Sequence, residues 1–228
     1  MEITLTHSNF LAILQLASPA LPVGAYGYSE GLEMLVESGT ITNIENLKDW
    51  LKFELIYGSI RLDAAVMVRV FSAVQMDDME ALKQWNLWLS AVRDTEELRA
   101  ASWQMGRSLM QLLGKLEPEI LPLINAVGYP GNYAIAFAIA CSHWDINIQA
   151  ALLAYLHSWA NNLITAGIKL IPLGQTVGQE LLLSLQPLLT STVGEILTME
   201  DDDLGCCSWG LSLASMQHET QYTRLFRS

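Results

Sequence analysis

Basic residues are scarce in this chain. Its 228 residues include 12 Lys and Arg against 24 Asp and Glu, which gives a formal net charge of −12. A nucleic-acid-binding protein needs a basic surface to neutralise phosphates, and adhesion to anionic membranes needs one as well. The sequence therefore argues against both partners. The acidic balance favours a basic protein partner or the attraction of cations.

Cysteines and membrane-spanning runs are scarce too. Three cysteines, an odd number, do not make a disulfide framework. The most apolar stretch, residues 150–171, contains His157 and Lys169, which are costly in lipid, so it does not read as a membrane span. The first residues lack the basic start and apolar run of a signal peptide. We therefore expect a cytoplasmic protein.

The common catalytic signatures are missing. There is no Gly-x-Ser-x-Gly nucleophile elbow and no HExxH or CxxC motif. Gly24, Gly27 and Gly31 do not form a phosphate loop, because the Lys-Ser/Thr end of that motif is absent. No GxGxxG sequence opens a dinucleotide-binding unit. Nothing in the sequence supports an enzyme.

Candidate metal ligands are present without the usual spacing. Cys206 and Cys207 are adjacent and His218 lies further on, whereas zinc sites carry paired ligands at short intervals. Cys141 ends an apolar run and is more typical of a buried small hydrophobe. The acidic run at 200–203 is expected to be a solvated loop. A soft-cation site at Cys206 and Cys207 across a dimer axis stays open as an alternative.

Helical periodicity predominates, and β-branched alternation over four or more residues is nearly absent. With 51% hydrophobic residues, a chain of this length can bury a sizeable core in one domain. We predict a single all-α domain spanning residues 1–228, a bundle of about ten helices with a partly irregular C-terminal tail. The predicted helices cover about 8–17, 29–37, 43–58, 62–74, 77–92, 95–113, 132–142, 148–170, 175–185, 187–197 and 211–216, with a short helix between loops in 114–130.

Residues 18–33 combine two prolines, three glycines and two tyrosines. Proline fixes φ and lacks a backbone donor, so the part from Ser18 to Pro22 cannot be helix interior. Glycines permit backbone shapes that other residues avoid. Taken alone, this segment is interpreted either as a packed turn between helices or as a recognition loop.

Residues 199–228 form a C-terminal tail, and its last ten residues are poorly suited to staying solvated. These ten residues combine two cations, Arg224 and Arg227, with three large apolar or aromatic side chains. Such a tail either docks on its own domain or waits for a partner. The three side chains are Tyr222, Leu225 and Phe226.

Two polar groupings fall on otherwise apolar or helical segments. Ser158, Asn162, Thr165 and Lys169 follow steps of four, three and four, so they share one helix face. Polar groups within a hydrophobic bundle form a satisfied network, line water, or meet a partner. The charged group at 93–99 holds pairs three and four residues apart, which are usually solvated. These charges could instead bridge to the arginines of the tail.

Four blocks of this chain, in this order, match the signatures of one family. The blocks are residues 18–33, 93–99 with 104–109, 158–163 with 169–175, and 218–228. They resemble the UreF urease accessory proteins. One departure is visible, because Gln217 stands where the family often has an arginine just before the His-Glu pair.

The resemblance implies a dimeric, all-helical, non-enzymatic adaptor. UreF-like proteins join UreD and the GTPase UreG in the complex that loads nickel into apo-urease, so nickel and GTP are expected to be handled by the complex and not bound by this chain directly. The resemblance also implies a set of partner-contact residues, and we expect the tail from Tyr222 to dock beside Tyr26 and to become ordered on binding. The implied contact residues are Tyr26, Tyr28, Glu30, Lys169, His218, Glu219, Tyr222, Arg224, Leu225, Phe226, Arg227 and Ser228.

Two alternative functions stay open at this point. The first is a metallochaperone that binds nickel in its own right through Cys206, Cys207 and His218. The second is a helical scaffold unrelated to metal.

Overall fold

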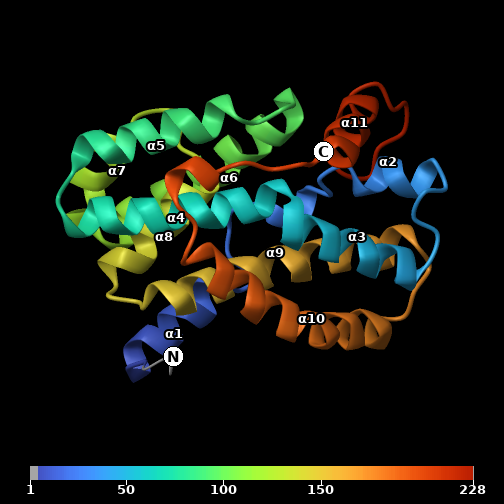
Figure 1. The fold of residues 1–228 in the computed structure, drawn as a ribbon, viewed down its shortest axis with the longest axis horizontal. Coiled ribbons are helices and arrows are strands. Elements are labelled where there is room, and N and C mark those ends of the chain that lie inside the picture. The colour runs from blue at the N-terminus through green and yellow to red at the C-terminus, as the bar shows by residue number, and fades with distance from the viewer. Residues whose placement is uncertain (1–4, 228) are drawn as a thin grey trace.

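The structure, a computed structural model, describes residues 5–227. In that span every regular element is a helix, which confirms the predicted all-α class (Figure 1). Three of the elements are short 3-10 turns, η1 (Ala25–Gly27), η2 (Pro118–Ile120) and η3 (Asp201–Asp203). The α-helices are α1 (His7–Leu16), α2 (Leu32–Glu37), α3 (Ile44–Tyr57), α4 (Ser59–Gln75), α5 (Met79–Ala91), α6 (Glu96–Leu116), α7 (Leu121–Val127), α8 (Tyr133–His143), α9 (Ile148–Leu170), α10 (Gln175–Ile196) and α11 (Trp209–His218).

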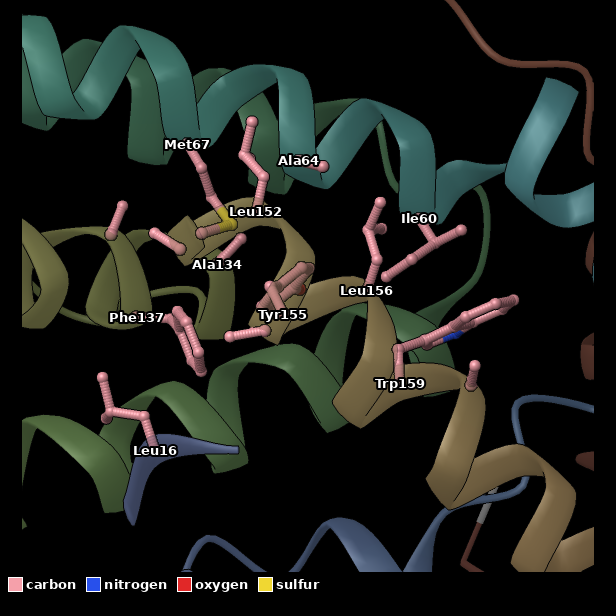
Figure 2. Packing of buried hydrophobic residues seen from close by; sticks show 14 of the residues in the cluster. Leu16, Ile60, Ala64, Met67, Ala134, Phe137, Leu152, Tyr155, Leu156 and Trp159 are labelled. Carbon is pink, nitrogen blue, oxygen red and sulfur yellow. The ribbon is translucent and has the colours of Figure 1, made fainter. Parts of the chain in front are cut away.

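Helix α8 lies at the centre of the bundle. Its residues from Ala134 to Cys141 are all fully buried, as expected for a helix that is apolar all round. It packs against α4, α6 and α9. The ring of Phe137 lies 5.2 Å from that of Tyr155 on α9, and Met67 of α4 reaches toward Leu152 of α9 in the same cluster (Figure 2). The bundle is therefore organised around one apolar helix.

Gly106 allows α6 to approach the start of α8 closely. A Cβ atom at this position would lie 2.2 Å from the carbonyl oxygen of Gly131 and 2.6 Å from the carbonyl carbon of Asn132. Real Cβ atoms do not come so close to backbone atoms. Glycine at 106 is therefore required by the packing of α6 on α8.

Two helix starts differ from the sequence prediction. Thr6, and not Ser8, caps α1, because its Oγ1 accepts a hydrogen bond from the backbone N–H of Asn9. Helix α2 begins at Leu32 and not at 29, because Glu30 and Gly31 adopt left-handed φ angles of 50° and 76°. That conformation cannot belong to a right-handed helix.

Helix α10 also corrects the prediction. The sequence places two helices, 175–185 and 187–197, on either side of Gln186, but α10 continues through Pro187. Proline removes one helical hydrogen bond and disfavours a helix interior. Here Leu185, Leu189 and Val193 are buried on the same side of the helix, and α10 packs along α9 and α3. Tertiary burial of that face outweighs the local penalty.

The first and the last of the four sequence blocks lie near one end of the bundle. Helix α11 lies beside α2, and the C-terminal segment ends next to them, whereas α5 and α7 lie at the other end of the long axis (Figure 1). Among the helices of residues 5–227, none has the length and hydropathy needed to cross a membrane.

Candidate partner-binding site

In the loop before α2, a glycine sets the backbone conformation and one of the two tyrosines is exposed. Gly24 has a left-handed φ of 80°, which reverses the chain into η1. Tyr26 is 73% exposed, whereas Tyr28 is buried. Of the two tyrosines expected to contact a partner, only Tyr26 therefore presents its ring to solvent.

The C-terminal tail is seated on this loop within the single chain. The backbone N–H of Arg227 donates to the carbonyl oxygen of Gly27 at 2.8 Å. Phe226 is only 6% exposed, and the Nζ of Lys169 lies 5.9 Å from the centre of its ring. The predicted docking of the tail beside Tyr26 is thus present in the structure. Ser228 lies outside the described residues.

The side chain of Glu33 on α2 binds the main chain of the tail. Its Oε1 accepts a hydrogen bond from the N–H of Leu225 at 2.7 Å, and its Oε2 accepts one from the N–H of Phe226 at 2.9 Å. Hydrogen bonds to an ionised acceptor are stronger than neutral ones. Because Glu33 itself is buried, the two N–H groups replace water as its partners.

A second set of contacts fixes the end of α11. His218 is fully buried, with Nδ1 2.9 Å from Glu97 Oε2 and Nε2 3.5 Å from Glu33 Oε2. Arg224 donates from Nη1 to Glu97 Oε1 at 3.1 Å. The expectation that the charged group at 93–99 could bridge to the tail is confirmed for Arg224. Glu33 of α2 and Glu97 of α6 therefore hold the tail through contacts with His218, and Glu97 also binds Arg224.

The polar face of α9 lies beneath the loop and beside the tail. Asn162 donates from Nδ2 to the carbonyl oxygen of Tyr28 at 3.2 Å, and Thr165 donates to the carbonyl oxygen of Asn161. Lys169 is exposed, and its Nζ lies over the ring of Phe226. These polar groups are thus partly satisfied by the loop, which connects the third block of the sequence to the first and the last.

A buried charged network lies deeper under the loop. Arg93 approaches both carboxylate oxygens of Asp63 at 2.7 Å, and the hydroxyl of Tyr155 donates to Asp63 at 3.0 Å. Trp159 donates from Nε1 to Glu30 at 3.0 Å. Burial raises the pKa of the Glu30 carboxyl above its ordinary value. These groups line a cavity of about 60 Å³, which has the size and polarity to hold water.

Comparison with known proteins identifies the relationship. The UreF family matches residues 41–186. The urease accessory protein UreF of Nostoc sp. (strain PCC 7120) is 75% identical over 225 residues, which cover 99% of this chain and 98% of the relative. The chain belongs to the UreF family. The UreF proteins of Microcystis aeruginosa and Alkalilimnicola ehrlichii are 55% and 42% identical, covering 98% and 94% of this chain and 100% and 93% of those relatives.

In this UreF-family chain, four expected contact residues lie beneath the surface. Tyr28, His218 and Phe226 are buried, and the carboxylate of Glu30 turns inward to Trp159. They support the loop and tail from inside the domain. The expected contact residues with exposed side chains are Tyr26, Lys169, Glu219, Tyr222, Arg224, Leu225 and Arg227.

The alternative metal ligands of the UreF-family chain are not brought together. Cys206 and Cys207 are exposed free thiols, whereas both ring nitrogens of His218 face carboxylates. In the part of the chain that the structure describes, no group of three or more His, Cys, Asp or Glu side chains is placed to hold a metal ion. Cys141 is buried, as predicted.

The sequence analysis does not identify Glu33 and Asp63 as hydrogen-bonding partners within the site. Glu33 and Asp63 had a signal, because each is an acid within an apolar helix, and a buried acid needs a partner. The four-residue spacing of Arg93 and Glu97 allows a local ion pair, but the structure pairs Arg93 with Asp63 on α4. Helical spacing does not reveal partners on other helices.

A further buried acid supports the segment that leads into α11. Glu54 of α3 accepts from the hydroxyl of Ser208 at 3.4 Å, and the same hydroxyl accepts from the N–H of Ser59 at 2.9 Å. Burial raises the pKa of Glu54 to about 7. Its Oε1 has no hydrogen-bond partner among the described residues. Ionisation of this buried carboxyl therefore lowers the stability of the folded state next to the segment that leads into α11.

Proposed function

We propose that this protein is a non-enzymatic adaptor in urease maturation that works as a cytoplasmic homodimer. In this proposal it binds UreD and the GTPase UreG, and it helps couple GTP hydrolysis to nickel delivery into apo-urease. Nickel and GTP are handled by the assembled complex and not by a site of this chain alone. Membership of the UreF family supports the urease-related part, because the relatives compared above are named urease accessory proteins.

The observation that carries the adaptor role is the seated tail. The backbone N–H groups of Leu225 and Phe226 donate to Glu33, and the ring of Phe226 is buried against the domain. By contrast, the side chain of Tyr222 is fully exposed and that of Leu225 is 66% exposed. Large apolar side chains held outward on a fixed backbone are typical of protein-binding surfaces. The tail therefore supports a partner contact made by Tyr222 and Leu225.

Helix α11 extends this apolar surface. Trp209, Leu213 and Met216 are spaced four and three residues apart, so they share one face. All three side chains are exposed. An exposed apolar helix face indicates a binding surface, and α11 comes just before the last ten residues of the tail. We include α11 in the proposed contact with UreD or UreG.

The proposal is tested by pull-down of UreD and of UreG with tail variants. Deletion of residues 224–228 is expected to abolish capture of at least one partner. Leu225→Asp is expected to have nearly the same effect without removing the seat. Leu183→Asp on α10 is the matched control, because Leu183 is 63% exposed and lies on another helix. Capture of both partners at wild-type levels by both tail variants would overturn the proposed surface.

Tyr222 gives the sharpest separation between binding and stability. Because its side chain is fully exposed, Tyr222→Ser is expected to change the free energy of unfolding by less than about 0.5 kcal/mol. The same variant is expected to weaken partner capture at least fivefold. Urea denaturation and the pull-down measure the two quantities on the same preparation. A loss of capture together with a large loss of stability would mean that Tyr222 acts structurally.

Direct nickel binding is the second candidate, because Cys206 and Cys207 are adjacent exposed thiols. Equilibrium dialysis of nickel, with the wild-type chain and with the variant carrying Cys206→Ala and Cys207→Ala, tests whether the thiols bind nickel. Equal binding by both rejects a role for the thiols. Normal urease activation in a strain lacking this protein would favour a scaffold unrelated to metal.

A further inference from the structure

A groove of about 680 Å³ runs between α6 and α7, away from the tail. Sites that hold small ligands commonly measure roughly 300–1,000 Å³. Arg107 and Lys115 lie along one wall, and Leu121 and Ile124 lie along the other. None of its lining residues is acidic, although the chain has 24 acids and a net charge of −12. The groove is thus a basic and apolar site on an acidic protein.

The wall formed by α6 carries a regular row of donors. Arg107, Gln111 and Lys115 follow at intervals of four residues, so they share a face and span about 12 Å along the helix. The guanidinium of Arg107 lies 5.7 Å from the ring centre of Tyr129 and donates to its hydroxyl at 3.3 Å. This contact fixes the guanidinium at the mouth of the groove. An arginine held in this way loses little freedom when it binds a carboxylate.

Among the described residues, the two cations of the groove are not paired with a carboxylate of this chain, as is also true of five of its ten other cations. Within residues 5–227, neither Arg107 nor Lys115 forms an ion pair. Elsewhere in the chain five cations are paired with a carboxylate. These pairs are Lys52 with Asp49, Arg61 with Glu195, Arg69 with Asp201, Arg93 with Asp63 and Arg224 with Glu97.

We propose that the groove binds a short, extended acidic segment of a partner protein. Two carboxylates of that segment bind Arg107 and Lys115, and an apolar side chain between them packs on Leu121 and Ile124. In an extended chain, about four residues span the 12 Å between the two cations. A nucleic acid fits less well, because a long polyanion is repelled by the net charge of the whole protein.

This surface is separate from the tail. Helix α7 lies at the opposite end of the long axis from α11 and the C terminus (Figure 1). The groove therefore leaves the tail free, and the protein can hold an acidic segment and a tail-bound partner at once. The inference goes beyond the proposed adaptor surface and does not depend on it.

The test measures binding of a fluorescein-labelled octapeptide, Asp-Glu-Leu-Asp-Glu-Leu-Glu-Asp, by fluorescence anisotropy at low salt. The full chain is expected to bind it, and the Asn/Gln version of the peptide is expected to bind at least tenfold more weakly. The variant with Arg107→Glu and Lys115→Glu is expected to lose at least tenfold in affinity. The control with Lys48→Glu and Lys52→Glu changes the net charge equally on α3, and it is expected to stay within about threefold of wild type.

Several outcomes would overturn the inference. They are no binding by the wild-type chain, equal losses in the two double variants, and stronger competition by a single-stranded oligonucleotide than by the unlabelled peptide. A dimer that dissociates in the groove variant during sedimentation would make a second copy the occupant. If the double variant unfolds, Lys115→Gln alone is expected to weaken binding about threefold. Deletion of residues 224–228 is expected to leave peptide affinity unchanged, which keeps this test independent of the tail.

Discussion

The apolar centre around α8 and the polar seat of the tail are stabilised by different forces. At the centre, Phe137 and its neighbours are fully buried and contribute through the area removed from water. At the tail, Glu33 and Glu97 contribute through a few directional contacts with backbone N–H groups, His218 and Arg224. Burial of apolar area is insensitive to pH, whereas carboxylate contacts depend on charge. The fold and the proposed binding surface should therefore respond to different perturbations.

The largest expected effect comes from the centre. Phe137→Ala removes a fully buried ring from α8 and leaves a cavity, so it is expected to lower the free energy of unfolding by about 3–5 kcal/mol. Urea denaturation measures this loss. Under conditions where the variant stays folded, protection of the tail from protease is expected to match wild type. Preferential cleavage of the tail in this variant would show that the centre and the tail are not separate.

Glu54 is expected to give the next largest effect, with the opposite sign. Its pKa is raised from 4.5 to about 7, so the folded state resists ionisation and stability falls as pH rises from about 4.5 to about 7. Glu54→Gln removes that penalty and is expected to stabilise the protein by about 1–3 kcal/mol at pH 8 and by almost nothing near pH 4. Thermal denaturation at both pH values measures the difference. Equal effects at pH 4 and pH 8 would exclude the ionisation of Glu54 as the cause.

Glu33→Gln tests the seat of the tail and is expected to have the smallest effect on the whole fold. A glutamine provides one acceptor oxygen where the carboxylate provides two, so one buried N–H of Leu225 or Phe226 loses its partner. The expected cost is about 1–2 kcal/mol. Because the loss is local, hydrogen exchange at these two amides should speed up about tenfold while the core amides change little.

The control for this variant is Glu180→Gln on α10, where the carboxylate is exposed. It is expected to leave both exchange rates unchanged. If Glu33→Gln also left the amides of Leu225 and Phe226 fully protected, the main-chain contacts would not be what seats the tail.

The separate parts of the site could be predicted, because each part is a short continuous segment of the sequence. The capping residue Thr95 begins α6 near the predicted position, and the aromatic and cationic tail was expected to dock beside the glycine-rich loop. Such features depend on backbone preferences and on the poor solvation of the tail, which neighbouring residues determine. The contact of Arg224 with Glu97 is among the expected possibilities, because the charged group at 93–99 offers carboxylates to a cationic tail.

The remainder depended on contacts between distant segments. Nothing near Glu33 in the sequence reveals that its carboxylate receives N–H groups from Leu225 and Phe226. The basic groove was also missed, because Arg107 and Lys115 are ordinary exposed residues of an amphipathic helix until α7 is placed opposite them. Their significance comes from the lining of the groove, which includes both cations and no acidic residue and which only the assembled fold brings together.

By itself, the sequence determined the all-helical class, most helix positions and the absence of familiar catalytic signatures. These properties follow from side-chain periodicity and from the chemistry of short motifs. Tertiary structure decided that α10 continues through Pro187, that Tyr28 and His218 turn inward, and that Arg93 pairs with Asp63. In each case the free energy of burying groups from distant helices outweighs the preference of the local sequence.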